Sequence, residues 1–147
     1  MVKTNTIKPS NKAELRFIIE QELQLQGPDA DLNHIDTSEI TDMKELFVGL
    51  KIRNIKIDKW DVGNVTNMQG MFSGCTEFNC DLSSWKVSNV QNMDYMFFDA
   101  RLFTSRLFSW NLSKVKKKSM MFQGACTFIR TLYSMNEFTL EELCDAF

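Results

Sequence analysis

Residues 60–75 read WDVGNVTNMQGMFSGC, and residues 85–100 repeat the pattern as WKVSNVQNMDYMFFDA. The tryptophan that opens each stretch recurs at Trp60, Trp85 and Trp110, at intervals of 25 residues. Self-similarity at a fixed period indicates a repeat protein, in which each unit buries its apolar side only against its neighbours. Further apolar columns keep the same interval, among them Leu46, Met71, Met96 and Met121, and Phe47, Phe72, Phe97, Phe122 and Phe147.

The columns predict a single domain over residues 1–147. Four 25-residue repeats are expected over 28–134, and a truncated fifth repeat over 135–147 is expected to close the C-terminal end. Residues 10–27 are expected to form an N-terminal capping helix, with Asn11 as its N-cap and Leu15, Ile18, Ile19 and Leu23 on its apolar face. A repeat stack needs such caps because its end units would otherwise expose their apolar sides.

Each repeat is predicted to contain one short helix and one short strand. Val65, Met68, Met71 and Phe72 follow helical spacing, and Gly49, Gly74 and Gly124 share the column where a left-handed residue would end that helix. Trp85 and Val87 alternate with Lys86, as in a strand with one buried face. The expected fold class is therefore α/β: a right-handed, leucine-rich-repeat-like solenoid in which short parallel strands alternate with short helices.

The stretch from Trp60 to Cys75, followed by FNCDLSSW over residues 78–85, resembles the repeat of the BspA-like leucine-rich-repeat proteins. The resemblance covers about residues 29–134. Those proteins are largely bacterial surface proteins. The resemblance implies a binding or adhesion module without catalytic residues, and it names no ligand, because the shared residues build the scaffold.

Composition points away from catalysis. His34 is the only histidine, so no triad or histidine metal cluster can be assembled, and the chain carries no phosphate loop or dinucleotide fingerprint. We therefore expect no enzyme activity, no catalytic residues, no cofactor, no metal site and no small-molecule substrate. The net charge of −2 makes nucleic acid an unlikely partner on global grounds.

The N-terminus and the cysteines bear on localisation and redox state. The N-terminus shows no signal peptide and no apolar run long enough for a membrane span, so a cytoplasmic protein is expected, or a secreted or cell-surface protein if the chain is trimmed. Cys75, Cys80, Cys126 and Cys144 fall in four different columns. Reduced thiols are expected, and the alternative is a Cys75–Cys80 bridge in a secreted molecule.

Partner-binding residues are sought where the repeats differ. Asp36, Asp61, Lys86 and Asn111 share one column of the predicted strands, and their side chains are expected on the outer face of the sheet. That column could carry recognition of a partner or could serve solubility alone.

A lysine cluster breaks the pattern in the fourth repeat. It comprises Lys114, Lys116, Lys117 and Lys118, and Lys118 stands in a column otherwise filled by Met or Leu. Because a buried unpaired lysine is costly, we expect Lys118 to extend outward. The first repeat carries Asp36, Glu39, Asp42 and Glu45, so the molecule is expected to be acidic at one end and basic at the other. Relaxed packing is the alternative explanation of the cluster.

Aromatic residues also replace polar ones beside the lysine cluster. Phe108 and Tyr133 stand where earlier repeats have Asp58 and Ser83. Tyr95, Phe98 and Met120 occupy helix positions that are expected to face outward. They could form an interface hot spot or could pack locally under loops.

The sequence thus favours a non-catalytic protein-protein interaction module that binds a protein partner through the strand face or the basic, aromatic C-terminal half. The alternative is a small intracellular inhibitor or effector, of phage or pathogen origin, that occludes a target protein. Nucleic-acid binding through the lysine cluster is a weaker third hypothesis.

Overall fold

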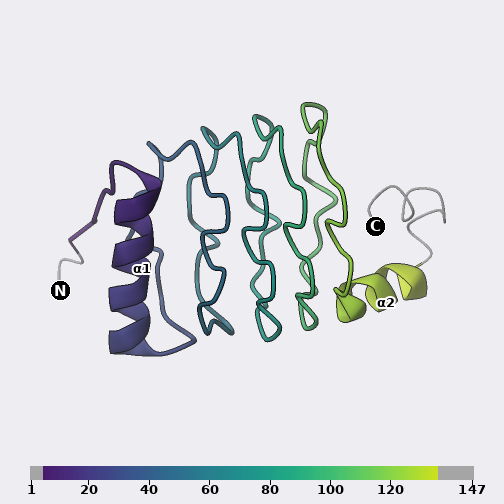
Figure 1. Ribbon diagram of the computed structural model, residues 1–147, viewed down its shortest axis with the longest axis horizontal. Helices are drawn as coiled ribbons and strands as arrows, with labels where there is room; N and C mark the ends of the chain where they lie inside the picture. Colours follow the sequence, from purple (N-terminus) through teal and green to yellow (C-terminus); the bar gives the residue numbers. More distant parts are fainter. Residues whose placement is uncertain (1–4, 136–147) are drawn as a thin grey trace.

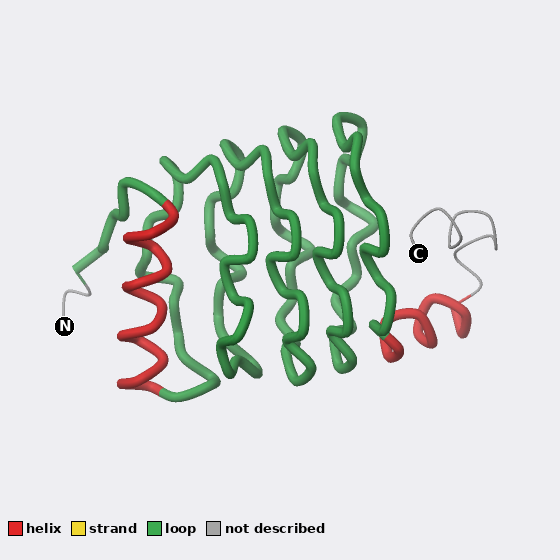
Figure 2. The backbone as a smooth tube through the Cα atoms, in the orientation of Figure 1, coloured by secondary structure: helices red, strands yellow, loops and turns green. Residues whose placement is uncertain are grey.

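The computed structural model describes residues 5–135. Helix α1, Lys12–Gln26, lies at one end, and helix α2, Cys126–Met135, lies at the other (Figure 1). Between them the chain winds through a series of similar loops that lie side by side (Figure 2). We call each loop a coil and number the four coils by one equivalent residue in each: Asp42, Asn67, Asn92 and Lys117.

The predicted alternation of strands and helices is wrong. Among residues 5–135, neighbouring coils are joined by isolated parallel bridges, and no bridge extends into a strand. One line of bridges runs from Asp42 to Asn67, Asn92 and Lys117. The segments predicted as repeat helices are successive turns instead. The right-handed, leucine-rich-repeat-like solenoid of strands and helices is therefore not what the chain forms.

The backbone hydrogen bonds explain why the repeat helices are absent. In the second coil the amides of Met68, Gly70 and Phe72 donate to carbonyls of the third coil at 2.8–2.9 Å. The amides of Met71 and Ser73, which each follow one of these residues, donate to carbonyls three residues back. An α-helix needs every amide to donate to the carbonyl four residues back. Because alternate amides donate to carbonyls of the neighbouring coil, the hydrogen bonds of an α-helix cannot form.

Left-handed residues interrupt each segment as well. Glu45, Gly70, Tyr95 and Met120 share one column with φ between 52° and 59°. A second column with positive φ holds Gly49, Gly74, Asp99 and Gly124. The left-handed conformation predicted for the second column is confirmed, although the helix that it was expected to end is absent. Two such residues four positions apart turn the chain repeatedly, since a left-handed residue cannot continue a right-handed helix.

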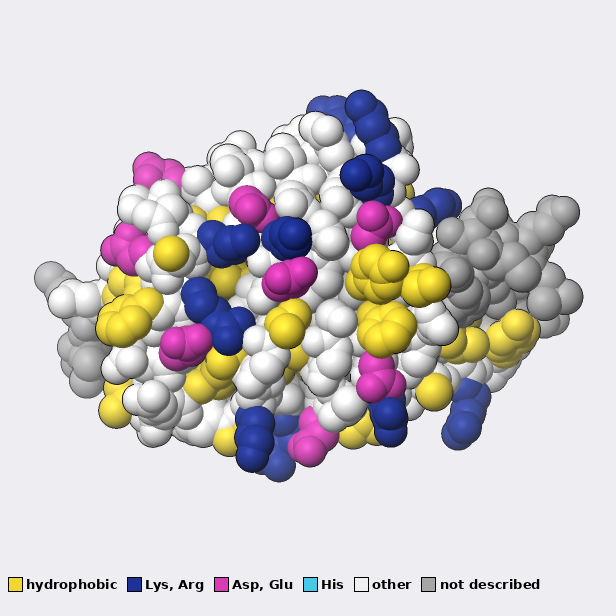
Figure 3. Space-filling model, viewed as in Figure 1, with side chains coloured by type: hydrophobic (Ala, Val, Ile, Leu, Met, Phe, Trp, Pro, Cys, Tyr) yellow, Lys and Arg dark blue, Asp and Glu magenta, His cyan; other side chains and the backbone are white. Residues whose placement is uncertain are grey.

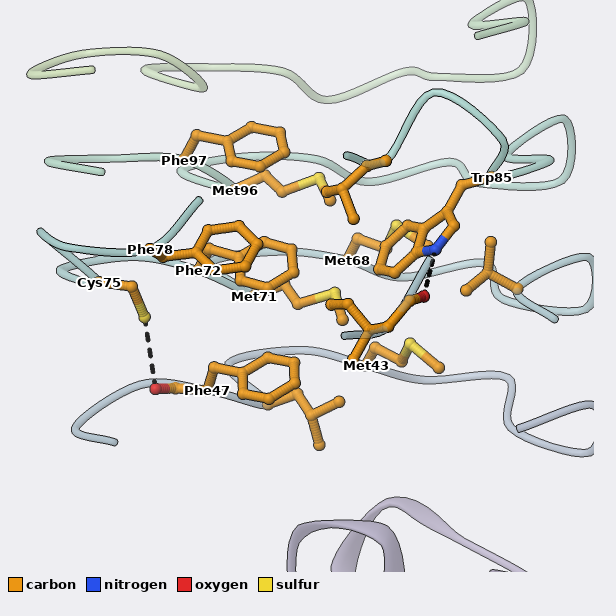
Figure 4. Close-up of a cluster of buried hydrophobic side chains, with 14 of the residues drawn as sticks. Met43, Phe47, Met68, Met71, Phe72, Cys75, Phe78, Trp85, Met96 and Phe97 are labelled. Carbon is orange, nitrogen blue, oxygen red and sulfur yellow. Dashed lines mark hydrogen bonds between the residues drawn. The ribbon is translucent and has the colours of Figure 1, made fainter. Parts of the chain in front are cut away.

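Tryptophan and phenylalanine columns fill the space between the coils, as their recurrence predicts. Each tryptophan is at most 7 % exposed, and its indole N–H donates at 2.9 Å to a backbone carbonyl of the preceding repeat. Phe47, Phe72, Phe97 and Phe122 stack with ring centroids 5.2–5.6 Å apart. Figure 4 shows the first three of them. These contacts fix the spacing of the coils.

A second phenylalanine column was missed in the sequence. Phe78, Phe103 and Phe128 follow the same interval, with centroids 5.8 and 5.6 Å apart. Phe78 also stacks on Phe72 at 4.2 Å, so the two columns form one aromatic core. Its members could have been found from their spacing of 25 residues.

Helix α1 covers the first coil. Asn11 is its N-cap, with the side-chain oxygen accepting from the Glu14 amide at 3.0 Å. The Glu14 carboxylate accepts from the Ser10 amide, one residue before the position that a capping box would use. Leu15 and Ile19 are fully buried. Arg16 donates to the carbonyls of Leu46 and Val48, which ties the helix to the turns of the first coil.

The coil pattern ends at Ala125, because residues Cys126–Met135 form α2 where the preceding repeat has turns. Phe128 and Leu132 are buried on the inner side of this helix. The fourth repeat therefore does not complete another coil before residue 134. Apart from Met135, the predicted truncated fifth repeat lies outside the described residues.

Candidate interaction surface

The column of Asp36, Asp61, Lys86 and Asn111 does not line a sheet, because the described residues form none. Three of its members close turns instead. The side-chain oxygens of Asp36, Asp61 and Asn111 each accept from the backbone amide two residues on, at 2.9–3.0 Å. Asp and Asn favour such positions because this hydrogen bond mimics a backbone turn. The column's polarity therefore has a structural explanation at every position except the exposed Lys86.

The acidic first repeat is largely neutralised by the segment before it. Lys8 Nζ lies 3.2 Å from Glu39 and 3.6 Å from Asp36, and Lys12 Nζ lies 3.5 Å from Asp42. The hydrogen bond to Glu39 and the charges of both carboxylates raise the pKa of Lys8. Hydrogen bonds from Ser38, together with the charge of Lys8, lower the pKa of Asp36. Three of the four residues of the expected acidic end are thus paired within the chain, and Glu45 forms no ion pair with a described residue.

The lysine cluster of the fourth coil is exposed. The Lys114 amine donates to Asn89 Oδ1 at 2.8 Å, whereas Lys116, Lys117 and Lys118 extend into solvent. None of the four forms an ion pair with any residue that the structure describes. Lys118 is exposed, as predicted, and it follows the bridge at Lys117 in a segment that contains no helix.

Lys117 also breaks a series of turn-closing side chains. At the equivalent position the first three coils have Asp42, Asn67 and Asn92, whose side-chain oxygens accept from the amide two residues on at 2.8–3.0 Å. A lysine cannot accept a hydrogen bond. In the fourth coil the Ser119 amide donates to Asp94 of the third coil instead, at 2.8 Å. The turn is therefore closed without Lys117, whose amine takes no part in it.

An apolar group lies over the third and fourth coils. Tyr95 and Met120 are 39 % and 40 % exposed, and Phe98 is half-buried. The rings of Tyr95 and Phe98 meet edge to face, with centroids 5.9 Å apart. We call Tyr95, Phe98 and Met120 the apolar patch. Figure 3 shows a group of hydrophobic side chains on this face, with acidic side chains next to it and Lys and Arg side chains beyond one of them.

Phe108 and Tyr133 are both exposed, by 49 % and 53 %. Phe108 lies in the turn before Trp110, and Tyr133 lies on α2. The prediction that they occupy equivalent positions in successive repeats is wrong, because the chain is helical at Tyr133 and turned at Phe108.

His34 is half-buried rather than exposed, and its Nε2 lies 3.4 Å from Glu22 Oε1 of α1. The two side chains border a hollow between α1 and the first coil, which Asp31 and Lys59 also line. Across residues 5–135, no group of three or more His, Cys, Asp or Glu side chains is placed to hold a metal ion.

The cysteines that the structure describes are free thiols. Cys75 is buried, with its Sγ 3.5 Å from the Phe47 carbonyl oxygen (Figure 4). Burial raises the pKa of the Cys75 thiol to about 12 and also raises that of Cys80. Cys126 is exposed, and Cys144 lies outside the described residues.

One protein family matches over residues 19–135, under the description "Mycoplasma protein of unknown function, DUF285". The chain belongs to the DUF285 family. The match begins inside α1 and ends with α2, so it includes all four coils of this DUF285 member. No curated protein and no solved structure matches the chain. None of the helices in the described part has the length and apolar character needed to span a membrane.

Proposed function

We propose that this DUF285 member is a non-catalytic protein-interaction module that binds a protein partner through its third and fourth coils and α2. One observation carries the proposal. Ten large hydrophobic side chains of the described residues are exposed, and six of them lie between residues 95 and 133. A concentration of exposed apolar side chains is typical of interaction surfaces, whereas exposed apolar residues scattered singly over a surface are normal.

The rest of the described chain supports a scaffold role. Every buried side-chain nitrogen or oxygen atom in it has a hydrogen-bond partner, as expected of polar groups that serve the fold. Its recurrent Asp and Asn side chains close turns, as at Asp61 and Asn67. An active site normally gathers polar groups with unsatisfied or perturbed chemistry in a cavity. The polar groups here are used by the fold itself.

The proposal is tested by affinity capture with the purified protein immobilised. Wild type is compared with a triple variant, Lys116→Glu, Lys117→Glu and Lys118→Glu, and bound proteins are quantified by mass spectrometry. A matched control, Lys51→Glu, Lys56→Glu and Lys59→Glu, makes the same charge change at exposed lysines of the earlier repeats. We expect a partner that is retained by wild type and the control and lost by the triple variant. Equal retention by all three proteins, or retention of nothing, contradicts the proposal.

The inhibitor or effector hypothesis is a narrower form of the same proposal. A single dominant partner, whose own activity falls when the protein binds, supports occlusion of a target. Several partners bound without loss of their activities support a general interaction module instead.

A further inference from the structure

We propose that the apolar patch and the lysine cluster together form a docking surface for an acidic protein segment that carries an apolar anchor side chain. This inference rests on the proposed function and names the partner's chemistry. It combines the distribution of charge, the backbone conformation at the patch and the adjacency of the two groups.

Three of the four acidic side chains of the first repeat pair with lysines, whereas the lysines of the fourth coil have no ion-pair partner among the described residues. Lys8 and Lys12 pair with Asp36, Glu39 and Asp42 at the first coil. No carboxylate of the described residues pairs with Lys116, Lys117 or Lys118 at the fourth coil. Exposed cations without internal partners attract an anionic surface and accelerate its association. The fourth coil therefore complements an acidic partner.

Tyr95 and Met120 occupy positions that do not favour them. Their φ angles are 58° and 52°, in the left-handed region, where the second coil has Gly70. For a residue with a Cβ this conformation is unfavourable. Neither side chain offsets this by full burial, because both remain about 40 % exposed. Glu45 takes the same conformation in the first coil, so the turn itself requires it, and in the third and fourth coils this turn presents apolar side chains to solvent.

The apolar patch and the lysine cluster adjoin. The Tyr95 amide donates to the Ser119 carbonyl at 2.9 Å, which sets Tyr95 beside the segment that contains Met120. Asn92 and Lys117 form the bridge just before these residues, so Lys117 lies three positions from Met120 on the same segment. An aromatic and methionine centre with basic residues at its edge matches the composition of interface hot spots.

A protein segment fits this surface better than a nucleic acid does. The rings of Tyr95 and Phe98 meet at 63°, so they offer no pair of parallel platforms for successive bases. Met120, the third member of the patch, has no ring to stack. An apolar side chain of a peptide can cover all three residues, while its carboxylates reach Lys116, Lys117 and Lys118.

The test starts with a displayed library of short random peptides, selected on the full chain. Enriched peptides should be acidic and should share an aliphatic or aromatic anchor. Their binding is then measured by fluorescence polarisation against the triple variant Lys116→Glu, Lys117→Glu and Lys118→Glu, against Tyr95→Gly with Met120→Gly, and against the Lys51, Lys56 and Lys59 control. We expect at least about tenfold weaker binding for the first two variants and no change for the control.

Thermal unfolding separates binding from folding. Glycine accepts the left-handed conformation without strain, so Tyr95→Gly with Met120→Gly should not unfold at a lower temperature by more than a few degrees, while its binding falls. Tyr95→Phe keeps the ring and should keep binding. Enrichment of neutral or basic peptides, failure to enrich any peptide, or tighter binding of oligo(dT) than of the acidic peptides overturns the proposed partner chemistry. If affinity capture with the same preparation still finds a partner, the proposed interaction module holds even though the proposed partner chemistry fails. Failure of the partner chemistry and failure of the proposed function are therefore distinguishable.

Discussion

The indole N–H of Trp85 donates to the backbone carbonyl of Ile57 at 2.9 Å. Trp60 and Trp110 bond in the same way to Leu32 and Leu82, each 28 residues earlier in the chain. Each tryptophan therefore both fills the space between coils and fixes their register through one buried polar bond.

Trp85 should be among the residues on which folding most depends. We expect Trp85→Ala to lower the free energy of unfolding by about 3–5 kcal/mol, because it opens a cavity between the coils. Trp85→Phe keeps most of the ring and removes only the indole hydrogen bond, since the Ile57 carbonyl still accepts from the Trp60 amide, so the expected loss is about 1 kcal/mol. Urea unfolding followed by far-ultraviolet circular dichroism measures both. A loss below about 1 kcal/mol for the alanine variant would contradict the stacked core.

Asp61 should act through its turn and not through a partner. Asp61→Ala removes the hydrogen bond to the Gly63 amide and should cost about 1 kcal/mol of stability, while partner capture stays unchanged. Asp61→Asn retains the acceptor and should unfold like wild type. Lys86→Ala, in the same column without such a bond, is the matched control and should change stability little. Loss of the partner on Asp61→Asn would restore the recognition hypothesis for this column.

Gly74 tests the left-handed column. Its φ is 73°, and no atom lies within 4 Å of the position that a Cβ would take, so a substitution there is opposed by conformation alone. Gly74→Ala should destabilise the fold by about 1–2 kcal/mol. Gly74→Asn should cost less, since asparagine tolerates this region better. If both variants unfold at the wild-type urea concentration, the turn does not require a left-handed residue.

Thiol labelling should separate the cysteines by burial. At pH 8, Cys126 should react with iodoacetamide rapidly, whereas Cys75 should react only after unfolding, because its thiol is buried and protonated. Peptide mapping after timed labelling gives the order. Equal rates at Cys75 and Cys126 in the folded protein would contradict the described core.

Cys75 should also make stability depend on alkaline pH. Its pKa rises from 9.0 to about 12 on folding. Between these values the unfolded chain loses the proton and the folded chain keeps it, so stability should fall as pH rises from 9 towards 12. Below pH 9 both states hold the proton and this contribution vanishes. Cys75→Ala should flatten the alkaline part of the urea-midpoint profile, and an unchanged slope would contradict the assignment.

Recurrence in the sequence was enough to find the repeats and much of the core. Trp60, Trp85 and Trp110 are buried at the interval that revealed them, and Gly49 and Gly74 are left-handed as predicted. Such features are readable because a column that must pack against its own copies can hold only a few residue types.

The secondary structure of each repeat could not be read in the same way. Val65, Met68, Met71 and Phe72 show the spacing of a helix, but consecutive turns place the same residues inward. The choice depends on whether the amides of Met68 and Gly70 find acceptors in the next coil, and that coil is 24 residues away in the chain. A local pattern carries no information about hydrogen bonds at that distance.

The candidate surface, too, could be predicted only in part from the sequence. Sequence indicated the exposed Lys118 and the apolar Tyr95, because both break a column. It could not show that Lys8 and Lys12 neutralise the acidic first coil, or that Asp36 and Asp61 close turns, since both depend on where side chains meet in space. The apolar residues that recur at a fixed interval determined the register in which the coils stack. The partner of each polar group was set by folding, because hydrogen bonds and ion pairs form between atoms that are close in space and not between positions that are alike in sequence.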